Sequence, residues 1–181
     1  MDSTLQLDQW YNLAVKHRNE HNCSAYPYDE YSILHAYVSQ LCPKRILEIG
    51  TGIGFTAAVM AAVDAGIHVD TIEKDLEHVA SAKKFLRDIS LDSRVDILSG
   101  IAEEILPQLS DQYDFIFFDG YQIHYEFLPH YERLLKTGGT LFLGNNHLNS
   151  KTSDHFFAEL SDATKWEIVE KFSDTSVIKK K

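Results

Sequence analysis

The sequence predicts an α/β fold in which a mostly parallel sheet carries helices on both faces. From Arg45 onward, short apolar runs typical of strands alternate with segments at helical spacing, which favours crossovers between parallel strands. The runs are apolar almost throughout, as expected of strands that are buried on both faces. Near the end of the chain only Ser173, Asp174 and Thr175 separate two strand-like runs, so one strand is expected to be antiparallel.

The expected elements follow one another along the chain. Before the sheet, apolar residues recur at helical spacing in two groups, which predicts two helices. Pro43 ends the second of these helices. The polar and aromatic stretch between the groups, from His17 to Tyr28, is expected to be a loop or a broken helix. The strand candidates are 45–49, 68–73, 95–99, 113–119, 140–143, 166–172 and 176–180. The helix candidates after the first strand are 55–65, 76–89 with Asp75 as its N-cap, 102–109, 126–135 and 153–160.

Composition favours one globular domain that binds a small molecule or another protein. The chain has 181 residues, of which 44% are hydrophobic, and no apolar run reaches the length of a membrane span. A helical segment of about residues 1–43 precedes the sheet. The formal net charge of -10 argues against nucleic acid, although a local basic patch would still allow it. Cys23 and Cys42 lack a CxxC spacing and the start of the chain lacks the pattern of a signal peptide, so a cytoplasmic location is expected.

The strongest motif is a glycine-rich turn between the first strand and the helix that follows. The stretch LEIGTGIG places Gly50, Gly52 and Gly54 where a ligand can approach the backbone closely. The N-terminus of the next helix favours a carboxylate or a phosphate. Glu73 closes the second strand, where a carboxylate can accept hydrogen bonds from two ribose hydroxyls. This order of strand, turn, helix, strand and acid is typical of a site for a nucleoside cofactor.

Two nucleoside cofactors compete for this layout. A dinucleotide site prefers the spacing GxGxxG, whereas this turn has GxGxG. Glu48, two residues before the first glycine, would be a poor neighbour for a pyrophosphate and a good one for a cationic amino-acid head group. The residues therefore favour S-adenosylmethionine over a dinucleotide as the cofactor. A nucleotide-dependent oxidoreductase is accordingly the disfavoured alternative.

Two longer stretches resemble a known family. LEIGTGIGFT resembles the first motif of class I S-adenosylmethionine-dependent methyltransferases, and with DFIFFDG…HYEFLPHYERLLKTGG it resembles the catechol/caffeoyl-type O-methyltransferases. The resemblance runs from about Tyr28 to the last residue. It implies a Rossmann-like sheet of seven strands in the order 3-2-1-4-5-7-6, with the seventh strand antiparallel. It also implies one methyltransferase domain over residues 1–181, O-methylation of a small hydroxylated acceptor, and a homodimer.

The resemblance assigns cofactor contacts residue by residue. The residues that it places against S-adenosylmethionine are Glu48, Gly50, Thr51, Gly52, Gly54, Glu73, Lys74, Gly100, Ala102 and Asp119. Family members usually carry an acid between the glycine and the alanine that lie beside the adenine, and Ile101 replaces that acid here. The adenine contacts therefore depart from the family pattern more than the ribose contacts do.

The reactive half of the site also departs from the family. Family members bind a divalent cation with an acid that matches Asp119 and with an Asp-Asn pair, which here reads Asn145 and Asn146. An amide in place of a carboxylate should weaken the affinity for Mg²⁺. Gln122 stands where the family often has a lysine base, and an amide cannot take up a proton.

Another group must then remove a proton from a hydroxyl substrate. The candidates for this catalytic role are Asp119, His124 and His147. The two histidines are near in sequence to the two loops at the carboxyl edge of the sheet, and histidine has a pKa that suits a base. Two alternatives remain open. One is a methyltransferase of RNA or protein, because this fold serves many acceptors. The other is a catalytically weakened module that binds S-adenosylmethionine, which Gln122 and Asn145 suggest.

Overall fold

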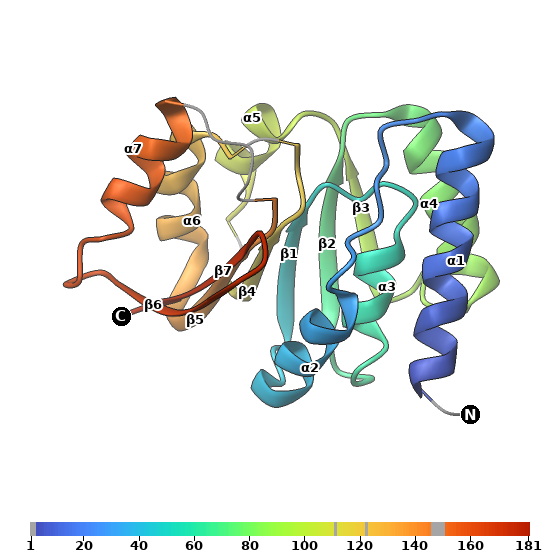
Figure 1. Cartoon of the computed structure of the whole chain (residues 1–181), viewed down its shortest axis with the longest axis horizontal. Helices are drawn as coiled ribbons and strands as arrows, with labels where there is room; N and C mark the ends of the chain where they lie inside the picture. The colour runs from blue at the N-terminus through green and yellow to red at the C-terminus, as the bar shows by residue number, and fades with distance from the viewer. Residues whose placement is uncertain (1–2, 111, 122, 146–150) are drawn as a thin grey trace.

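The structure of the chain is a computed structural model, and it describes residues 3–110, 112–121, 123–145 and 151–181. Helices precede the sheet, and strands and helices alternate after them (Figure 1). The strands are β1 (Arg45–Ile49), β2 (His68–Glu73), β3 (Val95–Ser99), β4 (Tyr113–Phe118), β5 (Leu135–Leu143), β6 (Trp166–Phe172) and β7 (Thr175–Lys180). The helices are α1 (Ser3–His21), α2 (Tyr31–Leu41), α3 (Phe55–Ala61), α4 (Leu76–Asp88), α5 (Ala102–Ile105), α6 (Leu128–Leu134) and α7 (Lys151–Glu159), with 3₁₀ turns η1 (Leu106–Gln108) and η2 (Tyr125–Phe127).

The strands form one seven-stranded sheet in the order β3-β2-β1-β4-β5-β7-β6. Strand β7 runs antiparallel to both β5 and β6, whereas β1 pairs in parallel with β2 and β4. The expected strand order and the antiparallel seventh strand are therefore confirmed. Since the chain order reverses on either side of β1, the turn after β1 lies at the switch point where α/β sheets bind their ligands.

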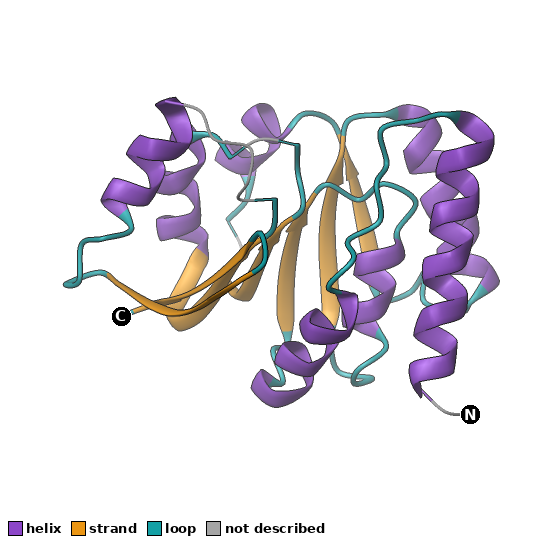
Figure 2. Cartoon of the chain, viewed as in Figure 1, coloured by secondary structure: helices purple, strands orange, loops and turns teal. Residues whose placement is uncertain are grey.

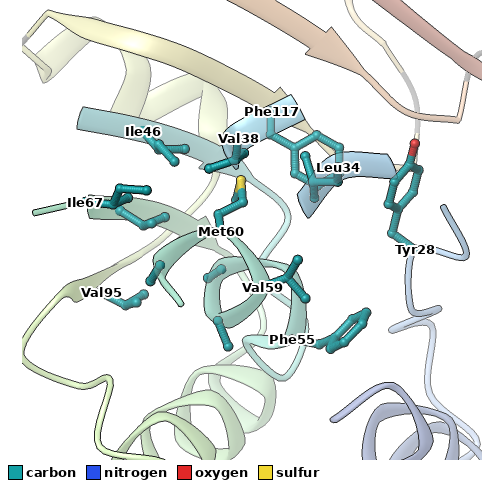
Figure 3. Close-up of a cluster of buried hydrophobic side chains, with 14 of the residues drawn as sticks. Tyr28, Leu34, Val38, Ile46, Phe55, Val59, Met60, Ile67, Val95 and Phe117 are labelled. Carbon is teal, nitrogen blue, oxygen red and sulfur yellow. The ribbon is translucent and has the colours of Figure 1, made fainter. Parts of the chain in front are cut away.

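Helices flank the sheet on both sides (Figure 2), and one hydrophobic cluster lies on each face. One cluster joins the sheet to side chains of α1, α2, α3 and α4, and part of it is drawn in Figure 3. The other joins the sheet to α6 and α7. Along β4, Phe115 and Phe117 belong to the first cluster, while Ile116 and Phe118 belong to the second. Burial on both faces explains why this strand is apolar throughout.

Several boundaries differ from the expected ones for local reasons. Helix α1 continues through His17 to His21, so the expected break begins later. The helix expected over 102–109 is α5 followed by the 3₁₀ turn η1, because Pro107 has no amide hydrogen to continue α-helical bonding. The helix expected over 55–65 ends at Ala61. Strand β5 begins at Leu135 instead of 140, and an irregular register against β4 accommodates the additional residues.

The expected N-cap of α4 is confirmed. The Asp75 carboxylate accepts hydrogen bonds from the amides of Glu77 (2.8 Å) and His78 (3.2 Å), and so it caps α4. Cys23 and Cys42 are both free thiols. Within the described part of the chain, no helix is both long enough and apolar enough to cross a bilayer.

Candidate functional site

The carboxyl ends of β1, β2 and β4 meet at one edge of the sheet, where the candidate residues gather. The amide of Gly50 donates to the carbonyl of Ile72 (3.1 Å), and the amide of Asp119 donates to the carbonyl of Ile49 (2.9 Å). These bonds hold the glycine turn beside the segment after β4. Gly50 has a φ of +98°, and a Cβ atom there would lie 2.8 Å from the Asp119 carbonyl oxygen. Only glycine meets both requirements.

Glu48 is fully buried immediately before the turn. Its Oε2 accepts a hydrogen bond from the Thr71 hydroxyl at 2.5 Å, and the Thr51 hydroxyl lies 2.6 Å from that of Thr71. Its Oε1 has no hydrogen-bond partner among the described residues. Burial raises the pKa of Glu48 to about 7; the hydroxyls of Thr56 and Thr71 oppose the rise, and the charge of Glu73 adds to it. Because a buried acceptor without a donor is costly, Oε1 is suited to a donor on a ligand.

The Glu73 carboxylate is oriented by two backbone amides. Its Oε2 accepts a hydrogen bond from Gly52 (2.8 Å), and its Oε1 accepts one from Asp75 (2.9 Å). Each carboxylate oxygen keeps a further lone pair for donors such as ribose hydroxyls. The amide of Gly100 donates to the Glu73 carbonyl at 2.8 Å, which brings the segment after β3 to the same place. The side chain of Lys74 is exposed beside it.

The other predicted cofactor residues lie at the same edge of the sheet. Gly54 has a φ of +85° and directly precedes α3. Gly100 follows β3, and Ala102 begins α5, where it packs partly against the second hydrophobic cluster. Ile101, between them, is 40% exposed. An apolar side chain with this exposure is available to pack against a flat ligand ring.

Asp119 and Asn145 form a pair across the ends of β4 and β5. The Asn145 Nδ2 donates to Asp119 Oδ1 (3.2 Å) and to the Gly120 carbonyl (3.2 Å). Burial of the carboxyl group raises the pKa of Asp119 well above its ordinary value. The negative charge of Glu48 and a smaller effect of Asp29 add to the rise, while the hydrogen bond from Asn145 opposes it. Asp119 therefore binds a proton more tightly than an ordinary aspartate does.

The described residues around Asp119 do not fit the divalent cation that the family resemblance implies. A metal would need the side-chain oxygen of Asn145, whereas the nitrogen of this amide faces Asp119. The raised pKa of Asp119 also disfavours the charged oxygen that hard cations prefer. Asn146, the other expected ligand, lies outside the described residues.

Among the described residues, His124 is the remaining catalytic candidate. His124 is half-buried, and its ring centroid lies 5.3 Å from that of Phe127. His147 and Gln122 lie outside the described residues. Tyr121 is 83% exposed and is therefore free to meet an acceptor.

The segment joining α1 to α2 crosses the carboxyl edge of the sheet (Figure 1). A Cβ atom on Gly52 would lie 3.4 Å from Ala25, so this segment covers the glycine turn. Tyr28 is buried against Phe117, and its hydroxyl lies 2.6 Å from that of Thr175 at the start of β7. The segment is thus attached both to the sheet and to the hairpin formed by β6 and β7.

Sequence reasoning missed Thr71 among the residues around Glu48. Thr71 is the direct partner of the carboxylate, and it lies opposite Glu48 in the register of β1 and β2. A threonine and a glutamate inside two otherwise apolar strands were the signal available in the sequence. The register of the pair, however, is a property of the assembled sheet.

Comparisons with known proteins agree with this geometry. The family described as O-methyltransferase matches residues 2–169 of the chain. A catechol O-methyltransferase of Niastella koreensis is 36% identical over 115 residues, which cover 60% of this chain and 52% of that protein. A catechol O-methyltransferase of Mus musculus is 28% identical over 145 residues, which cover 75% of this chain and 54% of that protein. The matched region is therefore about half the length of these curated relatives.

Solved structures share the fold across almost the whole chain. A putative caffeoyl-CoA O-methyltransferase from Staphylococcus aureus superposes with a TM-score of 0.80 at 20% identity, covering 99% of each chain. An O-methyltransferase from Bacillus cereus, solved in complex with SAH, gives a TM-score of 0.82 at 18% identity, covering 96% of this chain and 91% of that one. With the family match over residues 2–169, the glycine turn and the strand order share one explanation: this chain belongs to the O-methyltransferase family.

Proposed function

We propose that this chain transfers the methyl group of S-adenosylmethionine to a hydroxyl oxygen of a small acceptor. The observation that carries the proposal is the buried Glu48 carboxylate, whose Oε1 has no partner among the described residues at the glycine turn. A cationic amino group is the natural partner for such an oxygen. The names of the relatives, which include catechol O-methyltransferases, support the choice of a hydroxylated acceptor.

The residues at the carboxyl edge fit this cofactor. We propose that Glu48 and the turn from Gly50 to Gly54, including Thr51, hold the amino-acid part, while Glu73 accepts hydrogen bonds from the ribose hydroxyls. Gly100, Ala102 and the exposed Lys74 are proposed to lie beside the nucleoside. When bound, S-adenosylmethionine supplies a methyl group on a positively charged sulfur.

The protein's own task is to orient the acceptor and to take up one proton. We propose that the ionised form of Asp119 accepts the hydroxyl proton at a carboxylate oxygen, because its raised pKa makes this form a stronger base than an ordinary aspartate. The half-buried His124 is the second candidate, and His147 remains a proposal outside the described residues.

The Asp119–Asn145 hydrogen bond favours one rival function. A carboxylate tied to an amide is less available as a base, which favours a weakened module that binds the cofactor without efficient turnover. A methyltransferase of RNA is disfavoured by the net charge of -10. We also propose that residues 1–181 act as one methyltransferase domain in the cytoplasm and that the domain forms a homodimer.

The test is methyl transfer from labelled S-adenosylmethionine to separate panels of catechols, simple phenols, RNA and protein. The proposal expects label on a catechol or phenol, and it expects the Asp119→Asn variant to lose at least about tenfold in kcat while still binding the cofactor. Label on RNA or protein alone would replace the proposed acceptor class. Cofactor binding without label in any panel would establish the weakened module.

A further inference from the structure

A cluster of metal-ligating side chains lies outside the site described above. It consists of His17 near the end of α1, Cys23 in the segment after α1, and His78 in the first turn of α4. One ligand atom from each residue lies within 4.8 Å of the ligand atoms of the other two. His78 is buried, with 7% of its surface exposed, and the other two residues are half-buried.

Packing between separate elements brings these three residues together. Trp10 of α1 meets Phe85 of α4 edge to face, with ring centroids 6.1 Å apart, which holds the two helices against each other. The Arg18 guanidinium lies 3.7 Å from the ring centroid of Tyr26, which holds the following segment against α1. The cap at Asp75 fixes the turn that carries His78. The arrangement is therefore supported from three sides.

The chemistry of the cluster favours Zn²⁺. One thiolate and two imidazoles form a ligand set that Zn²⁺ prefers and that Mg²⁺ does not. Bonds of about 2.0 Å to nitrogen and about 2.3 Å to sulfur would draw the ligand atoms somewhat closer together than they are here. Small side-chain rotations at the half-buried His17 and Cys23 would suffice for this. His21, one helical turn after His17 and stacked on it with ring centroids 4.4 Å apart, is available as a fourth ligand.

The Glu73 carboxylate lies close to the imidazole ring of His78. His78 Nδ1 lies 4.0 Å from Glu73 Oε1. Histidines that bind metals commonly direct their second ring nitrogen toward a carboxylate, which orients the ring. The other cluster of this kind among the described residues, His68 with Asp70 and Asp96, fits a metal less well, because Asp70 already pairs with Arg45 at 2.6 Å.

We propose that His17, Cys23 and His78 bind one Zn²⁺ ion, with His21 or a water molecule as the fourth ligand. The ion ties the segment after α1 to α4. Ala25 of this segment lies over Gly52, and His78 lies beside Glu73. The ion would therefore hold the segment after α1 in place over the glycine turn. The site requires neither the proposed acceptor nor turnover, so it stands or falls independently of the proposed function.

The test uses the whole chain, stripped of metal with a chelator and then titrated with Co²⁺, followed by displacement with Zn²⁺. The proposal expects one equivalent of Co²⁺ to produce visible bands of tetrahedral cobalt and a near-ultraviolet band from thiolate to cobalt. The Cys23→Ser variant should lose the thiolate band, and its metal affinity should fall by at least about tenfold. His78→Gln should weaken binding to a similar extent.

Matched controls come from the same chain. Cys42→Ser removes the other thiol, which is exposed and donates to the Ser39 carbonyl at 3.1 Å, and it should leave the spectrum unchanged. His35→Gln removes a half-buried histidine of α2 outside the cluster and should do the same. Circular dichroism of the metal-free variants verifies folding. Absence of the thiolate band in the original chain, its persistence in folded Cys23→Ser, or its loss in Cys42→Ser would each overturn the proposal.

Discussion

The two buried acids differ from ordinary surface carboxylates because of their immediate neighbours. Glu48 is fully buried near the carboxyl end of β1, where its Oε2 accepts a hydrogen bond from the Thr71 hydroxyl. Asp119 lies close enough for the negative charge of Glu48 to raise its pKa. Both groups therefore hold protons more tightly than they would in the unfolded chain. A positively charged ligand would stabilise the ionised forms of both acids and so lower both pKa values. The two acids are therefore suited to bind a cation.

The raised pKa of Glu48 predicts a specific pH dependence of stability. Its ordinary pKa is 4.5 and its folded pKa is about 7, so the folded state binds the proton more tightly. Stability from this group is present below about pH 4.5 and is lost as pH rises to about 7, by up to about 3 kcal/mol. Urea unfolding at pH 5 and pH 8 should show a smaller loss in Glu48→Gln than in the original chain. The exposed control Glu126→Gln should follow the original chain, and an unchanged loss in Glu48→Gln would contradict the assignment.

The Asn145 amide predicts weak binding of Mg²⁺. In Asn145→Asp, a second carboxylate would face Asp119 and create the charged oxygen pair that hard cations prefer. Calorimetry should detect little or no Mg²⁺ binding by the original chain and measurable binding by this variant. Asn12→Asp adds the same charge at an exposed position of α1 and should leave binding unchanged. Tight binding by the original chain would refute the prediction.

At the scale of elements, the glycine turn depends on close contact between β1 and β4. Gly50→Ala would combine a left-handed φ of +98° with a Cβ 2.8 Å from a backbone oxygen that cannot move aside. Gly138→Ala tests the φ effect alone, because its φ is +80° and no atom lies within 4 Å of the new Cβ. We expect a loss of about 1–2 kcal/mol for Gly138→Ala and a clearly larger loss for Gly50→Ala in urea unfolding. Equal losses of stability would show that the close contact with the Asp119 carbonyl oxygen adds nothing to the cost of the Gly50→Ala change.

The Tyr28–Thr175 hydrogen bond links the covering segment to β7. Removing one hydroxyl leaves the other buried without its partner, at a cost of about 1–3 kcal/mol. Tyr28→Phe and Thr175→Val should therefore each destabilise the protein, and the double variant should cost less than the sum of the two. A double-mutant cycle measures this coupling. Strict additivity would mean that the two hydroxyls do not interact.

At the scale of the whole molecule, local patterns predicted most of the architecture, and the family resemblance supplied the strand order. Apolar runs and the short link at Ser173 indicate the parallel sheet and its antiparallel end. Local patterns did not show that α6 runs directly into β5, because Gly138 and Gly139, which lie within β5, are residues typical of turns. They also could not show that His17 and Cys23 meet His78, since that contact depends on how α1 packs on α4.

We propose that the carboxyl edge of the sheet binds S-adenosylmethionine through Glu48 and Glu73. The most direct test of this proposal is calorimetry of the purified chain with S-adenosylmethionine, S-adenosylhomocysteine and NAD. We predict one binding site for the first two compounds and none for NAD. We also predict that Glu48→Gln weakens binding roughly tenfold or more, because a charged hydrogen bond is lost. Binding of NAD alone, or full affinity in Glu48→Gln, would contradict the proposal.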